Sequence, residues 1–236
     1  MPTGVEQNTA IIVAGGQGTR LGGPRAKQFL QLAGRPIVLH TLQRFEQCAA
    51  IDEIVLVLPA SETASFLAVA GRWNLRKLAR VVAGGASRAE SVWRGLQAVN
   101  ATTAGIVAVH DGVRPFVTAE EIALTVAAAA EHGAAVLAAP VVETIKEVRE
   151  GFIVATPPRA NLRRALTPQC FRYEILRRAY EQAGNLNDAA TDDSLLVERL
   201  GVAVWVVEGS PRNIKITTPE DLKLAETLLR HFVSGQ

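Results

Sequence analysis

The sequence predicts an α/β protein in which a mostly parallel sheet is covered by helices on both faces. Short runs of β-branched residues alternate with segments of helical spacing, which is the order typical of parallel sheets. Two of the runs end at glycine-rich turns, after residues 14 and 83. The chain has 236 residues, of which 48% are hydrophobic and 5% aromatic. That is enough apolar material for one sizeable core, and we expect residues 1–236 to form a single domain.

Seven strands are expected, at 9–14, 54–58, 80–83, 106–109, 134–139, 202–207 and 213–217. Helices are expected at 36–48, after a Ser61 cap, after the turn at 84–85, at 118–132, 171–183 and 192–200, and after Thr218. Residues 140–158 break this alternation with two roughly alternating runs around Arg149, Glu150 and Gly151. We expect this segment to form a β-hairpin arm that leaves the sheet.

Composition and charge argue against several classes of protein. The formal net charge of +2 does not indicate a nucleic-acid partner. The first eight residues lack the apolar run of a signal peptide, and no stretch approaches the ~20 apolar residues of a membrane span. Cys48 and Cys170 lie far apart without zinc-ligand spacing, so we expect buried thiols. These features predict a cytoplasmic protein without a nucleic-acid or membrane partner.

The strongest functional signal is AGGQGTRLGGPRAKQF at 14–29, directly after the first predicted strand. Its glycines let backbone N–H groups approach phosphates, and Arg20 and Lys27 add positive charge. A loop of this kind suits a nucleoside triphosphate. It is neither a Walker A loop nor a GxGxxG fingerprint. The alternative is an ordinary glycine-rich turn, which leaves the two cations unexplained.

A second motif, HDGVRP, follows the fourth predicted strand at 110–115. At the carboxyl edge of a sheet, the Asp111 carboxylate can hold Mg²⁺, which prefers oxygen ligands. The alternative is a turn, because Asp before Gly is common there. His110 is expected to be a packed or hydrogen-bonding residue rather than a base.

The other polar motifs are weaker. GGASRAESV at 84–92 places two glycines, Arg88 and Ser91 where they can contact a base and a ribose, and Ser87 with Glu90 also fits a capping box. Isolated candidates are Thr144, Arg159, TPQ at 167–169, TDD at 191–193 and NIKIT at 213–217. Arginines at 163, 164, 177 and 178 are expected on solvated helix faces.

Taken in order, AGGQGTRLGG, KQF, GGASRAESV, HDGVRP, PVVETIK, LTPQ, TDD and NIKITTPEDL resemble the 2-C-methyl-D-erythritol 4-phosphate cytidylyltransferase family over nearly the whole chain. The resemblance implies a Rossmann-like sheet, a homodimer joined through the β-arm, and transfer of CMP from CTP to a polyol phosphate with release of pyrophosphate. It implies Mg²⁺ on Asp111. Arg212 stands where some members have an Asp near the metal, so phosphate oxygens and water would complete the coordination.

The resemblance also assigns the individual site residues. Catalytic roles fall to Arg20, Lys27 and Lys215, and contacts to CTP fall to Ala14, Gly15, Gly16, Gly18, Gly85, Arg88, Ser91 and Asp111. Contacts to the polyol phosphate fall to Thr144, Arg159 and Thr191. Two alternatives stay open at this point: a D-ribitol 5-phosphate cytidylyltransferase and a non-catalytic nucleotide-binding protein.

Overall fold

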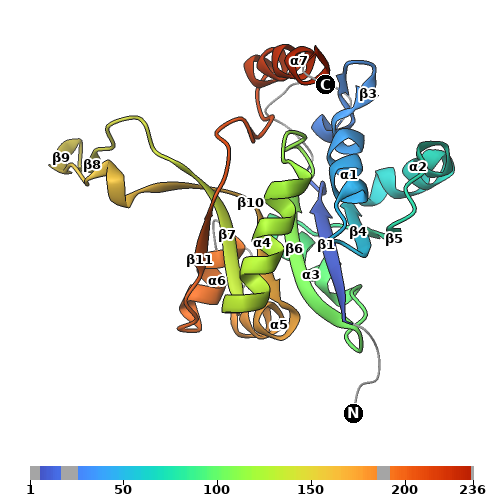
Figure 1. The fold of residues 1–236 in the computed structure, drawn as a ribbon, viewed down its shortest axis with the longest axis horizontal. Coiled ribbons are helices and arrows are strands. Elements are labelled where there is room, and N and C mark those ends of the chain that lie inside the picture. The colour runs from blue at the N-terminus through green and yellow to red at the C-terminus, as the bar shows by residue number, and fades with distance from the viewer. Residues whose placement is uncertain (1–5, 17–25, 185–191, 235–236) are drawn as a thin grey trace.

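A seven-stranded sheet forms the centre of the molecule, in the strand order β11-β7-β10-β6-β1-β4-β5 (Figure 1). The structure is a computed structural model that describes residues 6–16, 26–184 and 192–234, with backbone only at 231–234. The strands are β1 (Gln7–Val13), β4 (Glu53–Leu58), β5 (Leu78–Ala83), β6 (Ala104–Asp111), β7 (Ala134–Pro140), β10 (Arg163–Arg172) and β11 (Trp205–Glu208). All neighbouring pairs are parallel except those of β10, so the predicted fold class is confirmed.

Helices cover both faces of the sheet and bury separate hydrophobic clusters (Figure 1). One face carries α1 (Ile37–Gln47), α2 (Ala60–Ala70) and α4 (Ala119–His132). The other carries α3 (Arg88–Gln97), α5 (Tyr173–Gln182) and α6 (Asp193–Arg199). On β1, Ala10 and Ile12 face the first cluster and Ile11 the second, all fully buried. Such two-sided burial explains the unbroken apolar run of this strand.

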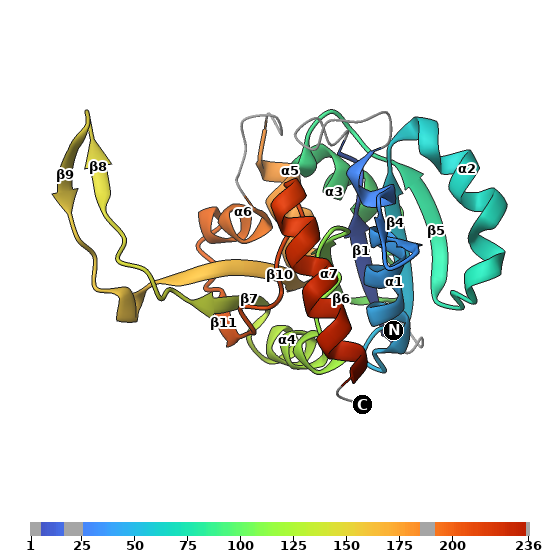
Figure 2. The same cartoon turned by 90° about the horizontal axis from the view of Figure 1, so that it is seen from above.

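The C-terminal helix α7 (Pro219–Ser234) lies over a third, smaller cluster (Figure 2). Its buried Ala225 belongs to this cluster, together with Ile37 at the start of α1 and Ile216 just before α7. Another short pair of strands, β2 (Gln31–Leu32) and β3 (Arg35–Pro36), precedes α1 and also contributes to this cluster through Leu32. These elements share a small hydrophobic core, separate from the two clusters that flank the sheet.

The predictions of helix caps from the local sequence were partly correct. Thr118 and Glu121 form a reciprocal capping box on α4, and Ser87 accepts a hydrogen bond from Glu90 N on α3. Glu90 itself accepts from Ala86 N rather than from Ser87, so the second box is incomplete. The predicted Ser61 cap was wrong, because α2 already begins at Ala60 after Pro59.

The strand β10 was not predicted, and the prediction for Arg163 and Arg164 was wrong. Both arginines lie in this strand, which runs antiparallel between β7 and β6, rather than on a helix face. Its pairing with β7 is interrupted between Ala165 and Gln169. That irregularity accommodates Pro168, which cannot donate a backbone hydrogen bond to a neighbouring strand.

The predicted strand at 213–217 was also wrong. These residues form an extended segment outside the sheet, held by Ile216 N, which donates to Val113 O at 2.9 Å, and by the buried Asn213. The path of this segment is therefore set by side-chain contacts and by isolated backbone hydrogen bonds, rather than by a strand ladder.

The hairpin arm was correctly located. Strands β8 (Glu147–Arg149) and β9 (Phe152–Ala155) form a separate two-stranded sheet that projects from the body (Figures 1 and 2). Glu150 and Gly151 at the turn have φ of 50° and 85°. Two positive φ values are typical of a tight type I′ hairpin turn. A short 3-10 turn, η4 (Arg159–Asn161), leads back into β10.

Within the described residues, none of the helices combines the length and the apolar character needed to cross a membrane.

A substitution at Gly95 would test how tightly α3 packs on the sheet. A Cβ at this position would lie 2.6 Å from Ile11 Cγ2 and 3.0 Å from Val57 Cγ2. Although alanine favours helix by about 1 kcal/mol, we expect Gly95→Ala to lower the free energy of unfolding by about 1–3 kcal/mol through overpacking. Urea denaturation measures this change. As the matched control, Gly71→Ala has open space around its Cβ and should be neutral; equal effects of both substitutions would contradict the packing account.

Candidate functional site

A cleft of about 850 Å³ lies at the carboxyl ends of β1, β4, β5 and β6. Loops that follow these strands line it, through Ala14 to Gly16, Pro59 to Ser61 and Gly84 to Arg88, together with Asp111 and Lys215. Its size falls in the range of small-molecule sites. In open α/β sheets this edge is where ligands bind.

Two glycine loops meet closely at one wall of the cleft. A Cβ on Gly84 would lie 2.9 Å from Ser91 Oγ and 3.3 Å from the Cα of Gly15, and a Cβ on Gly15 would lie 3.0 Å from Ser91 Oγ. Glycine is required because these backbones approach each other over one hydroxyl group. Ser91, itself buried, donates to Ser87 O at 2.8 Å and accepts from Gly85 N at 3.1 Å. Ser91 therefore fixes the shape of the turn at 84–85.

Asp111 lies at the end of β6 and is surrounded by cations. Its Oδ1 accepts from Arg88 Nε at 3.2 Å, and its Oδ2 accepts from Arg114 Nε at 3.2 Å and from Lys215 Nζ at 2.9 Å. The carboxylate side chain is only 8% exposed. Burial alone would raise its pKa, but the charges of Arg88, Lys215 and Arg114 outweigh burial and hold the pKa well below its usual range. Asp111 is therefore ionised throughout the physiological range.

Contacts on either side of Lys215 bring it to Asp111. Asn213 Nδ2 donates to Thr167 O at 2.8 Å, and Asn213 O accepts from Arg114 Nη1 at 2.9 Å. Two residues after Asn213, Lys215 reaches the cleft, and Ile216 then returns to the core. Although the strand prediction failed here, Lys215 lines the cleft beside Asp111.

His110 is a buried hydrogen-bonding residue, as predicted. Its Nδ1 lies 3.0 Å from Thr167 Oγ1 and its Nε2 lies 3.1 Å from Arg114 O. The Thr167 hydroxyl also lies 3.2 Å from Asp111 N, so it joins β10 to the end of β6. Burial lowers the pKa of His110 to about 3, which keeps the imidazole neutral.

The donor set of the cleft fits a hard cation only in part. Among the described residues, no group of three or more His, Cys, Asp and Glu side chains could hold a metal ion. Asp111 is the single carboxylate among the described residues that line the cleft. One carboxylate completed by substrate phosphates and water is a common arrangement for Mg²⁺. The site therefore fits this cation when a polyphosphate is bound with it.

The structure brings together most of the predicted nucleotide-contact residues. Those that line the cleft are Ala14, Gly15, Gly16, Lys27, Gly85, Arg88, Ser91, Asp111 and Lys215. Gly18, Arg20 and Thr191 lie outside the described residues.

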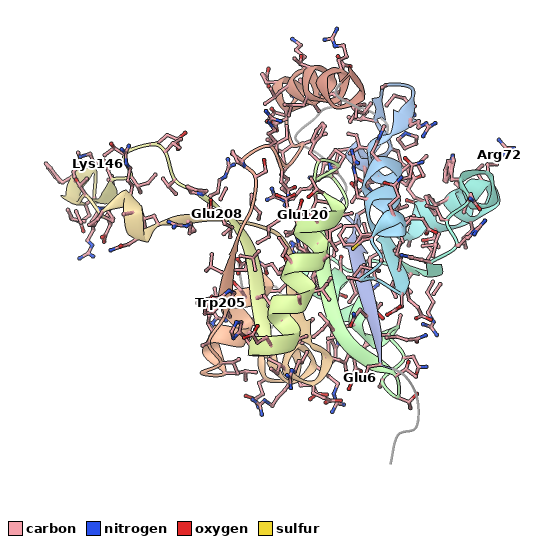
Figure 3. All side chains as sticks on the ribbon, viewed as in Figure 1. Glu6, Arg72, Glu120, Lys146, Trp205 and Glu208 are labelled. Atoms are coloured by element: carbon pink, nitrogen blue, oxygen red, sulfur yellow. The ribbon has the colours of Figure 1, made fainter. Side chains whose placement is uncertain are left out.

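Thr144 and Arg159 do not line the cleft. Thr144 is exposed, and Arg159 Nη1 donates to Val142 O at 3.1 Å at the base of the arm. Figure 3 shows Lys146 on the same arm, at the opposite side of the molecule from Arg72. The arm of one chain therefore holds these two residues away from the cleft of the same chain.

Two charged residues of the site were missed by sequence reasoning. Arg114 pairs with Asp111, and its signal was present in the HDGVRP motif itself. Asp193 pairs with Arg88 at 2.8 Å; the TDD segment at 191–193 was a candidate, but only Thr191 had been given a role. Nothing in local spacing indicates that Asp193 lies beside a residue 105 positions earlier.

The neutral state of His110 predicts a pH dependence of stability. Its pKa is about 3 in the folded chain against 6.5 for an ordinary histidine, so the unfolded chain binds a proton that the folded chain does not. Stability therefore falls as pH falls below 6.5, by about 2 kcal/mol between pH 7 and pH 5 from this residue. In His110→Gln the loss on acidification should shrink by this amount, as measured by urea denaturation at both pH values. An unchanged loss would contradict the assignment.

The chain is similar to one family of known proteins along nearly its whole length. A profile of the 2-C-methyl-D-erythritol 4-phosphate cytidylyltransferase family matches residues 8–231. The protein of that name from Symbiobacterium thermophilum is 47% identical over 222 residues, covering 94% of this chain and 92% of its own length. Its namesake from Pelotomaculum thermopropionicum is 45% identical over 228 residues, covering 96% and 95%.

Solved structures show the same relationship. The 4-diphosphocytidyl-2C-methyl-D-erythritol synthase from Anaerococcus prevotii superimposes with a TM-score of 0.85 at 31% identity, covering 95% of this chain and 96% of that one. The 2-C-methyl-D-erythritol 4-phosphate cytidylyltransferase of Thermus thermophilus gives a TM-score of 0.74 at 35% identity, covering 96% and 100%. With a profile match over most of its length and relatives above 40% identity, the chain belongs to the 2-C-methyl-D-erythritol 4-phosphate cytidylyltransferase family of enzymes.

Proposed function

We propose that this protein transfers CMP from CTP to 2-C-methyl-D-erythritol 4-phosphate, giving 4-diphosphocytidyl-2-C-methyl-D-erythritol and pyrophosphate. The observation that carries the proposal is the cluster of Asp111, Arg88 and Lys215 beside two glycine loops in one cleft. Glycine loops suit a triphosphate, and the cations suit its charge. The names of the relatives supply the choice of CTP and of the polyol phosphate.

In the proposed reaction a phosphate oxygen of the polyol phosphate attacks the α-phosphorus of CTP in line. A new phosphorus–oxygen bond forms, the bond from the α-phosphorus to the bridging oxygen breaks, and pyrophosphate leaves with the electron pair. The attacking group is already an anion near neutral pH, so no strong general base is needed. The task of the protein is to position two anions and to neutralise their charge.

Each charged residue of the cleft has a part in this task. Lys27 and Lys215 contact phosphates, and the same role is assigned to Arg20, which lies outside the described residues. Backbone N–H groups of residues 14–18 surround the triphosphate, while Gly85, Arg88 and Ser91 hold the base and ribose. Asp111 would hold Mg²⁺ with phosphate oxygens and water. When bound, the cation supplies charge neutralisation on the triphosphate.

The arm supports a proposal about assembly. Phe152 and Ile153 at its end are 77% and 63% exposed, an unusual state for such large apolar side chains. We propose that the arms of two chains exchange in a homodimer, with Thr144, Arg159 and Thr191 contacting the polyol phosphate and the first two acting in the partner's cleft. The enzyme is then one nucleotidyltransferase domain over 1–236 with residues 140–158 as the dimerisation arm. We place it in the cytoplasm, on its composition and its two buried thiols.

The function is tested by pyrophosphate release from purified protein with CTP and each of two polyol phosphates, with and without EDTA. We expect release with 2-C-methyl-D-erythritol 4-phosphate, much slower release with D-ribitol 5-phosphate, and loss of activity in EDTA that added Mg²⁺ restores. Preference for the ribitol ester would reassign the substrate, and no release with either would refute catalysis.

The roles of the lysines give a sharper prediction. Removing one preorganised cation at the developing charge costs on the order of 100-fold or more in rate. Lys27→Ala and Lys215→Ala should each lower kcat by at least that factor. Lys223→Ala, an exposed lysine of α7 outside the cleft lining, is the control and should keep normal turnover. Near-normal rates in both cleft variants would overturn the assignment.

The assembly proposal predicts that charge on the arm weakens the dimer. Phe152→Asp combined with Ile153→Asp should shift the sedimentation of the protein from dimer to monomer at micromolar concentration, because both side chains would lose their apolar contacts. Leu67→Asp alters another exposed apolar side chain, on α2 at the far side of the molecule, and should leave the dimer intact (Figure 1). An unchanged dimer in the arm variant would contradict arm exchange.

A further inference from the structure

Arg88, which lines the cleft, is held from two directions by carboxylates. Its Nε contacts Asp111 Oδ1 at 3.2 Å, and its Nη2 contacts Asp193 Oδ2 at 2.8 Å. Asp111 lines the cleft as well, whereas Asp193 does not. Two contacts at different nitrogens fix the orientation of a planar guanidinium, which one contact alone does not.

Asp193 is placed by a set of buried contacts. Its side chain is fully buried, and its second oxygen, Oδ1, accepts from Tyr180 Oη at 2.5 Å. Gln169 Oε1 in β10 accepts from the backbone N of both Asp193 and Ser194 at 3.0 Å. A strand of the central sheet therefore fixes the first turn of α6, and with it the position of the carboxylate.

Tyr180 connects this carboxylate to the helix that carries Arg88. Its ring stacks on Trp93 of α3 with centroids 5.9 Å apart and an interplanar angle of 10°, while its hydroxyl donates to Asp193. Arg88 is the first residue of the same helix α3. The guanidinium and its buried partner are thus held at both ends by one packed unit of α3, α5 and α6.

The charges explain why such a carboxylate is needed beside the cleft. Arg88, Arg114 and Lys215 all contact Asp111, and Asp111 has only two oxygens for them. Asp193 takes one side of Arg88, so the guanidinium does not depend on Asp111 alone.

We propose that Asp193, braced by Tyr180, is a positioning residue for the nucleotide: it orients Arg88 in the cleft and keeps Asp111 from being its sole counter-ion. Asp193 touches no substrate and acts only through Arg88. This inference rests on the proposed function, because it assigns Arg88 to CTP. Its loss weakens binding of CTP more than it slows turnover.

The test is a double-mutant cycle between Asp193→Asn and Arg88→Lys, read by the Kd of CTP from calorimetry and by KM and kcat from pyrophosphate release. Lysine keeps the positive charge but has no planar fork to bridge two carboxylates. We expect Asp193→Asn to raise the Kd and KM for CTP about tenfold with kcat changed less than threefold, and to have less than a twofold effect in the Arg88→Lys background. Equal effects in both backgrounds, or no effect on CTP binding, would overturn the proposal.

A second pair of variants guards against misfolding of Asp193→Asn. Tyr180→Phe removes only the hydroxyl that braces Asp193 and should raise the Kd for CTP about threefold. Tyr173→Phe removes a hydroxyl from the same face of the same helix, without a hydrogen bond to Asp193, and should leave the Kd unchanged. Equal Kd values in Tyr180→Phe and the wild type would overturn the proposal.

A merely structural ion pair would give a different pattern. It would couple Asp193 and Arg88 in the free energy of unfolding, measured in urea, but not in the Kd for CTP. Measurements on the wild-type protein distinguish failure of this inference from failure of the proposed function. A wild type that neither binds CTP nor releases pyrophosphate refutes the function itself, whereas an active wild type with uncoupled variants refutes only the role of Asp193.

Discussion

The site depends on one buried carboxylate, Asp111, which stays ionised because cations surround it. A carboxylate that is only 8% exposed would favour its neutral form without them. Arg88 arrives from the start of α3, Arg114 from the loop after β6 and Lys215 from the segment before α7. Three separate parts of the chain therefore converge on one side chain, and each of them also lines or supports the cleft. The same charges that hold the chain together at this point suit it for a polyanionic ligand.

The surrounding packing serves this convergence. Thr167 on β10 contacts His110 and Asp111 N, and its carbonyl holds Asn213, which leads to Lys215. Gln169 on the same strand fixes the start of α6 and so Asp193. The one antiparallel strand of the sheet therefore anchors the side chains that stand behind the cleft. Its position between β6 and β7 explains how it reaches both sets of contacts.

Hydrophobic periodicity and turn residues were sufficient to predict most of the fold, but not to predict the strand β10. Buried apolar runs such as 9–14 and 54–58 are detected from local sequence alone. The strand β10 contains Pro168 and two successive arginines at 163 and 164, features that argue against a central strand. Only the tertiary context, an interrupted ladder beside β7, makes the strand possible. The strand prediction for 213–217 failed for the opposite reason. Its alternating apolar residues fit a strand, but they fit equally well an extended segment that packs into the core.

Sequence reasoning located the parts of the site that sit in contiguous motifs. Residues 14–16, Lys27, Arg88 and Asp111 line the cleft, and each had been singled out from its residue type and its motif. Asp193 and Tyr180 had been given no role, since their significance comes from contacts across 105 positions to Arg88 and 13 positions to each other. Thr144 and Arg159 were singled out from the sequence, yet in one chain they stay apart from the cleft.

The most direct test of the central claim is a crystal structure of the protein with CTP and Mg²⁺. The account predicts a triphosphate against the backbone of residues 14–16, Lys27 and Lys215 within hydrogen-bonding distance of its oxygens, and the cation on Asp111. A nucleotide bound away from the turn after β1, with Asp111 still held by its three cations and no metal, would contradict it.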